Sequence, residues 1–222
     1  MWRKIIIAFF ALLLIFALVI TMLPAIYGQE KGMTTNKIET VLVPNRSPLV
    51  TLRILFLTGA ADDPKGKEGV AALTAAMLAK GGSRQHSYDQ IVESMYPMAT
   101  SFDWQADKEM TVFAGTTHVD NLEHYYALIK EMLLDPGFRQ EDLTRLQTDA
   151  VNFLKVSLRA GNDEELAKER LYNVIYAGHP YGHHNLGSLS ALDKLTLEDV
   201  RNFRKIDQVM LNGEWIDRSS LK

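Results

Sequence analysis

The 222-residue sequence contains no cysteine. Disulfide bridges, thiolate nucleophiles and cysteine-ligated zinc sites are therefore excluded, although the absence is compatible with an oxidising compartment. The sequence also lacks an excess of basic residues, because it has 24 Lys and Arg residues and 27 Asp and Glu residues, which give a net charge of −3. A chain without an excess of basic residues is a poor candidate for nucleic-acid binding. What remains is ordinary globular composition, with 47% hydrophobic residues, in a chain long enough to bury a core.

The N-terminus carries a long hydrophobic run. Residues 5–23 are almost entirely apolar and follow the basic residues Arg3 and Lys4. Such a run is long for a signal peptide and about long enough to span a bilayer. Residues 1–28 are therefore expected to be a signal peptide or an N-terminal membrane anchor, with a buried core helix as the less favoured alternative. In the first two cases residues 1–23 meet the membrane, and the domain is exported, periplasmic or anchored outside the cytoplasm.

Composition divides the rest of the chain into three parts. The polar residues 29–36 are expected to be a linker and residues 37–205 a folded domain. Residues 206–222 are expected to be an atypical or truncated tail, because their hydrophobic run is thin. Within this tail, a short hairpin is expected at 209–216 around Asn212-Gly213.

Hydrophobic periodicity in the domain alternates between two and 3.6 residues, which predicts strands and helices in turn. Strands are expected at 37–43, 49–57, 100–106 and 110–117, the first two forming a hairpin. Helices are expected at 68–80, 87–96, 122–134, 140–158, 164–176 and 196–204. This order predicts an α+β fold, with helices packed on one face of a largely antiparallel sheet.

Several short motifs then follow one another in a specific order. They are Gly69-Val70-Ala71, Met77-Leu78, Lys80-Gly81, Leu134-Asp135-Pro136, His179-Pro180-Tyr181-Gly182 and Leu186-Gly187. Over residues 37–205 this order resembles the N-terminal half-domain of the M16 zinc peptidases, the family of insulinase, pitrilysin and mitochondrial processing peptidase. The resemblance implies an M16-type half-domain, preceded here by the hydrophobic N-terminal segment.

The resemblance also implies where the family's zinc site would lie. The family motif is H-x-x-E-H, in which two histidines four residues apart bind zinc and the glutamate activates water. Here the histidine positions fall on Ala72 and Ala76, and the glutamate position falls on Ala75. A third family ligand, a glutamate on a later helix, falls at about Phe153 or Leu154. None of these side chains has a lone pair, so the resemblance implies no zinc cofactor and no catalytic residue.

The function implied by the resemblance is that of a non-catalytic M16 peptidase-like protein. M16 proteins enclose substrate in a shell of four similar half-domains, and in two-chain members a zinc-bearing subunit pairs with a subunit that lacks zinc. The expected partners are a zinc-bearing M16 subunit and unfolded peptide, bound partly through an exposed strand edge. Substrate-contacting residues are not assigned. Two alternatives stay open: a metallopeptidase active only with a partner or through a non-family site, and a truncated remnant.

Three histidines near the end of the domain are a further candidate site. His179, His183 and His184 are close in sequence, but Pro180 and Gly182 between them disfavour a regular helix. Loop histidines with local hydrogen bonds are therefore the favoured interpretation, ahead of a metal site or a pH switch.

The remaining polar candidates also have simpler interpretations. Ser83, Ser87 and Ser101 show no base in a suitable arrangement for a nucleophile. His118 and Asp120 are expected to lie at the start of a helix rather than to form a catalytic pair. Acidic residues before the helix at 68–80 are expected to favour its dipole, and these are Asp62, Asp63 and Glu68.

Overall fold

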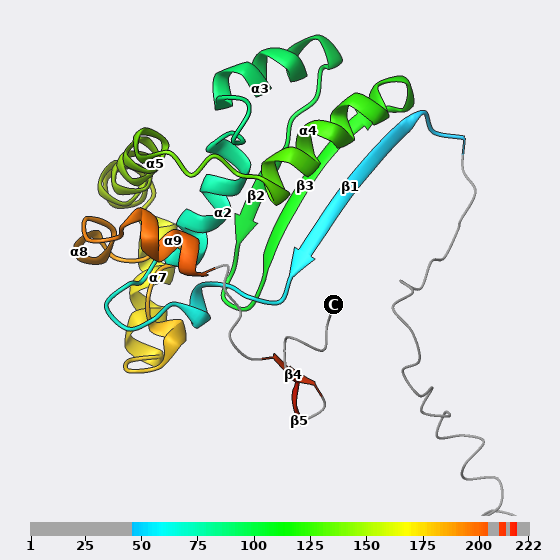
Figure 1. The fold of residues 1–222 in the computed structure, drawn as a ribbon. Helices are drawn as coiled ribbons and strands as arrows, with labels where there is room; N and C mark the ends of the chain where they lie inside the picture. The colour runs from blue at the N-terminus through cyan, green and yellow to red at the C-terminus, as the bar shows by residue number, and fades with distance from the viewer. Residues whose placement is uncertain (1–45, 204–208, 212–213, 217–222) are drawn as a thin grey trace, which may run out of the picture. The chain divides into compact units, whose positions relative to one another are not determined.

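The computed structural model describes residues 46–203, 209–211 and 214–216. Its main sheet has three antiparallel strands in the spatial order β1-β3-β2, so β3 is central (Figure 1). The strands are β1 (Leu49–Phe56), β2 (Asp103–Ala106) and β3 (Thr111–His118). The expected α+β class and antiparallel sheet are confirmed. The strand expected at 37–43 lies outside the described residues.

The helices follow the expected order closely. The longer ones are α2 (Val70–Lys80), α3 (Tyr88–Met95), α4 (Leu122–Leu134), α5 (Gln140–Asn152), α7 (Asp163–Ile175) and α9 (Leu197–Phe203). Short helical turns add η1 (Ala60–Asp62), η2 (Tyr96–Met98), η3 (Val119–Asn121), η4 (Phe153–Leu158), α6 (Arg159–Gly161), η5 (Pro180–Gly182) and α8 (Leu189–Leu192). The hairpin expected at 209–216 is present as β4 (Val209–Leu211) and β5 (Glu214–Ile216).

One face of the sheet is covered and the other is exposed. On the covered face, Phe113 is 1% exposed, stacks on Phe102 with ring centroids 5.8 Å apart, and packs with Tyr125 of α4. Figure 1 shows α4 lying along β3. The opposite face exposes Arg53 and Thr116. This alternation confirms helices packed on one face of the sheet, as expected for strands with one apolar side.

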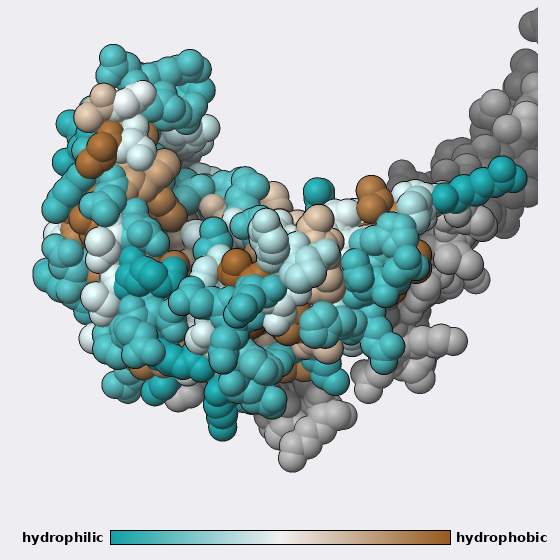
Figure 2. Space-filling model, turned by 90° about the horizontal axis from the view of Figure 1, so that it is seen from above, coloured by the Kyte–Doolittle hydropathy of each residue, from teal (hydrophilic) through white to brown (hydrophobic). Residues whose placement is uncertain are grey.

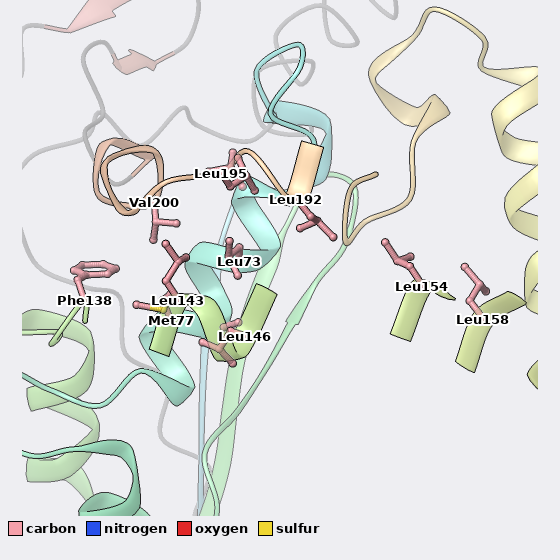
Figure 3. Close-up of a cluster of buried hydrophobic side chains, with 12 residues drawn as sticks. Leu73, Met77, Phe138, Leu143, Leu146, Leu154, Leu158, Leu192, Leu195 and Val200 are labelled. Atoms are coloured by element: carbon pink, nitrogen blue, oxygen red, sulfur yellow. The ribbon is translucent and has the colours of Figure 1, made fainter. Parts of the chain in front are cut away.

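Helix α2 is the centre of the fold, with nine of its eleven residues buried. Ala75 and Ala79 pack with Phe102, Phe113 and Tyr125 in a buried hydrophobic cluster beneath the sheet. The other side of α2 packs against α5 and α9, where Leu73 and Met77 gather with Leu146 (Figure 3). Small side chains let α2 pack closely on both sides, because the alanine methyl group adds little width to the helix.

The prediction of one regular helix over 140–158 is wrong. Helix α5 ends at Asn152 and continues as the π-helix η4. Leu154 and Leu158 are buried, but Phe153 is 42% exposed. A π-turn adds a residue to each turn and so rotates the following side chains relative to an α-helix.

The outer surface of the described part is mainly hydrophilic on the face shown in Figure 2, where apolar residues occur in scattered groups. Within residues 46–203, 209–211 and 214–216, no helix has the length and hydrophobicity needed to cross a bilayer. The hydrophobic run at 5–23 lies outside these residues.

Candidate functional site

An apolar cavity of about 200 Å³ lies where α2, α5, β2 and the start of η4 meet. Its walls come from elements far apart in the sequence, which the fold of α2 against the sheet brings together. The lining residues are Gly69, Ala72, Leu73, Ala76, Lys80, Trp104, Leu146, Asp149, Ala150, Phe153, Leu186 and Leu192. Only Lys80 and Asp149 among them carry charge, so the cavity has an apolar interior with two charged side chains in its lining.

The structure brings three of the expected positions together at this cavity. Ala72 and Ala76, four residues apart on α2, both line it, and so does Phe153. Leu154 instead lines a second cavity, of about 590 Å³. Ala75 is 2% exposed and packs in the cluster beneath the sheet. Of the two sequence candidates for the third position, Phe153 is therefore the one that shares a cavity with the two alanines.

The side chains at this cavity do not fit a zinc ion. Zinc in proteins is bound by nitrogen, sulfur or oxygen donors, and methyl and phenyl groups offer none. Asp149 supplies a carboxylate, but the neighbouring charged residue is Lys80, whose ammonium group is not a ligand. In the part of the chain that the structure describes, no group of three or more His, Asp or Glu side chains is placed to hold a metal.

Two backbone features position the first turn of α2 at the cavity. Gly69 precedes the helix with φ +104°, and a Cβ atom there would lie 2.5 Å from the carbonyl oxygen of Leu186. Gly187 has φ +85°, and its own Cβ would overlap the carbonyl group of Glu68. The Leu186-Gly187 segment and the entry to α2 can therefore lie in direct backbone contact because both positions are glycine.

Asp63 holds the same turn through its carboxylate. Its two oxygens accept hydrogen bonds from the backbone N–H groups of Gly69 (2.6 Å) and Ala71 (2.8 Å). Burial raises the pKa of Asp63 to about 6, although these two hydrogen bonds favour the charged form. The acidic residue expected to favour the helix dipole thus caps α2 directly.

The histidines after α7 make local hydrogen bonds. His179 Nδ1 accepts from the backbone N–H of Tyr181 (3.2 Å), and His184 Nδ1 accepts from that of Leu186 (3.0 Å). His183 Nδ1 lies 2.9 Å from the carbonyl oxygen of His184. Burial lowers the pKa of His184. These histidine side chains therefore stabilise, through local hydrogen bonds, the loop that packs on α2.

The serine candidates are also occupied by structural contacts. Ser83 is fully buried and donates to Glu131, which also lies 2.7 Å from His86 Nδ1. Because the carboxylate stands between the hydroxyl and the imidazole, His86 is not placed to take the proton of Ser83. Ser87 caps α3 by accepting from the N–H of Gln90.

Three residues at the cavity were not identified from the sequence as site residues. Trp104 lies within the strand expected at 100–106, and this partly buried residue also lines the cavity. Lys80 and Asp149 belong to separate helices. No local pattern links them, so only the packing of α2 against α5 reveals their proximity.

The sequence profile of the family described as Insulinase (Peptidase family M16) matches residues 40–188. The chain belongs to this family. Among curated proteins, it is 21% identical over 154 residues to an uncharacterized zinc protease of Rickettsia bellii, covering 69% of this chain and 37% of that protein. It is 24% identical over 206 residues to the human mitochondrial-processing peptidase subunit alpha, covering 87% of this chain and 39% of the relative. The chain thus spans about two fifths of the length of these relatives.

Solved structures show the same fold. A peptidase M16 inactive domain from Pseudomonas fluorescens matches with a TM-score of 0.63 and 27% identity, over 70% of this chain and 37% of that one. A protease from Helicobacter pylori matches with a TM-score of 0.64 and 15% identity, over 72% of this chain and 38% of that one. The periplasmic protease PqqL from Escherichia coli gives a TM-score of 0.61 at 15% identity, over 70% of this chain and 18% of that one.

Proposed function

We propose that this protein is a non-catalytic M16 family member that binds peptide and closes a chamber with a zinc-bearing M16 subunit. The observation that carries the proposal is the cavity at Ala72, Ala76 and Phe153. These residues converge at one place, as the ligand positions of a zinc site would, but they bring no atom able to bind the metal. The family's base position, Ala75, has no proton-accepting group. The protein therefore works without a zinc ion of its own.

Two of the similar proteins support this proposal. The structure with 27% identity is described as an inactive M16 domain. The human relative is named as a subunit, which supports a function carried out together with another chain. The free edge of β2 within the described sheet offers a place where an extended peptide could add a strand.

The N-terminal sequence supports export. We propose that residues 1–28 form a signal peptide or membrane anchor and that residues 29–36 link it to the M16 domain at 37–205. Residues 206–222 form a tail outside that domain. The domain then works in the periplasm or at the outer side of the membrane, where a zinc-bearing M16 partner would also be required.

The test is a peptidase assay of the full chain, alone and mixed with an M16 subunit that carries H-x-x-E-H. We expect no cleavage by the chain alone, and cleavage by the mixture that stops when the glutamate of the other subunit's motif is replaced by glutamine. The Rickettsia relative is named a zinc protease, and a protein of that kind would cleave peptide on its own. Chelator-sensitive cleavage by this chain alone would overturn the proposal and favour a metallopeptidase with a non-family site.

A further inference from the structure

We propose that the cavity of about 590 Å³ between η4, α7 and the loop at 182–189 binds an amphipathic anion, an aliphatic chain that ends in a carboxylate or phosphate group. This cavity shares no lining residue with the cavity at Ala72 and Ala76. The inference therefore adds a second binding site to the protein and does not depend on the proposed peptide-binding function.

The size and the apolar part of the cavity suit a small molecule. Ligand pockets commonly measure about 300–1,000 Å³ and are lined mainly by apolar side chains. Leu154 and Leu158 of η4, which are 5% and 6% exposed, line the cavity together with Leu166 of α7 and Leu189. Figure 3 shows Leu154 and Leu158 projecting to the same side of η4. An aliphatic chain packed against these leucines is removed from water, which favours its binding.

Two arginines supply the charge of the cavity. Arg159 is the first residue of α6 and Arg170 lies on α7, so the fold brings them to one cavity from separate elements. Neither guanidinium group has a hydrogen-bond or ion-pair partner in the part of the chain that the structure describes. Each guanidinium offers five N–H donors and no acceptor, in a planar arrangement that matches a carboxylate or a phosphate.

The other polar side chains of the lining already have partners. Glu169, the acidic residue of the lining, accepts a hydrogen bond from Asn173 Nδ2 (2.9 Å). His183, His184 and Ser188 make local hydrogen bonds within the loop and at the start of α8. The charged donors without a partner are therefore the two guanidinium groups, and a ligand that satisfies them carries negative charge.

Burial indicates how the ligand lies in the cavity. Leu154 and Leu158 are buried, whereas Arg159 and Arg170 are exposed. The aliphatic chain therefore enters against the leucines, and the anionic group stays near solvent between the arginines. An inorganic anion or an uncharged lipid chain satisfies only one of these two parts.

Isothermal titration calorimetry of the full chain with decanoate, below the concentration at which decanoate forms micelles, tests the proposal. Decanol keeps the chain without the charge, and acetate keeps the charge without the chain. Both should bind at least tenfold more weakly than decanoate. Decyl phosphate identifies the head group, because the tighter ligand of the two anions carries the preferred one.

A pair of double variants tests the role of the arginines. Arg159→Gln/Arg170→Gln should weaken decanoate binding at least about tenfold, because each lost hydrogen bond to a charged group weakens binding by about that factor. Arg46→Gln/Arg53→Gln makes the same change of charge at exposed positions outside the cavity and should leave binding unchanged.

Three results would overturn the inference. The first is an equal loss of binding in the two double variants. The second is decanol binding as tightly as decanoate, which would show that the chain alone is bound, as the hydrophobic run at 5–23 could do. The third is no binding of either decanoate or decyl phosphate. The ligand comparisons use wild-type protein, so they decide the matter even if a double variant fails to fold.

Discussion

At the scale of single residues, Asp63 affects both the stability of the fold and the position of the first turn of α2 at the cavity. Its carboxylate caps α2 from a loop six residues before Gly69, in partly buried surroundings. The charged carboxylate of Asp63 is less well solvated in this environment than in water. The raised pKa therefore reflects a free-energy cost of ionising Asp63 in the folded protein.

This cost predicts a pH dependence of folding. Because the pKa of Asp63 in the folded protein, about 6, lies above its ordinary value of 3.8, the folded state takes up the proton first. The stability from this group is therefore fully present below pH 3.8 and is lost as pH rises through 6. The full change is about 3 kcal/mol at about 1.4 kcal/mol per pKa unit.

Urea unfolding followed across this pH range measures the effect. Asp63→Asn should flatten the fall in free energy of unfolding between these two pH values, whereas Asp89→Asn, at an exposed position of α3, should keep the wild-type profile. A variant at Asp63 whose pH profile matches that of the wild type would contradict the role given to this carboxylate.

Some residues of the site could be predicted from the sequence and others could not. Ala72 and Ala76 could be placed on one face because residues four apart on a helix lie one above the other. Phe153 and Leu154 could not be separated, because their side-chain directions depend on the π-turn. The sequence FLKVSL at this turn has no glycine or proline to mark it, so packing rather than local propensity determines its geometry.

At the scale of elements, helix caps are contacts that local sequence can predict. Ser87 and Gln90 form the reciprocal capping box at the start of α3. Thr196 and Asp199 make the same kind of exchange at the start of α9. These contacts join residues three apart, so local sequence is sufficient to predict them. The contact between Gly69 and Gly187 joins distant segments and could not be predicted in this way.

The contact between Gly69 and Gly187 predicts that two glycine substitutions destabilise the fold by different amounts. Gly178 and Gly187 have similar φ values, +81° and +85°, but a Cβ atom at Gly178 meets nothing within 4 Å. Gly178→Ala should therefore pay only the left-handed backbone cost of about 1 kcal/mol. Gly187→Ala should add the overlap with Glu68 and lose roughly 3 kcal/mol or more.

Thermal unfolding of both variants provides the comparison. We expect the larger drop in melting temperature for Gly187→Ala, because its Cβ atom would overlap the carbonyl group of Glu68. Equal destabilisation of the two variants would show that the close backbone contact does not hold the loop to α2.

At the scale of the whole molecule, the chain has the fold of the M16 family, and we propose that the metal positions of this family fall here on side chains without a donor atom. The sheet and the helices place Ala72, Ala76 and Phe153 around one apolar space. Fold and function are separable here, because the fold depends on packing and the function on the few side chains at the site.

The most direct test of this account is the zinc stoichiometry of the full chain, measured by metal analysis after dialysis against zinc. We expect no stoichiometric zinc in the wild type and zinc bound by the variant Ala72→His/Ala76→His/Phe153→Glu, which supplies three ligands at the cavity. The matched variant with Leu154→Glu in place of Phe153→Glu should bind zinc more weakly, since Leu154 lines a different cavity. Stoichiometric zinc in the wild-type protein, removable by a chelator, would contradict the account.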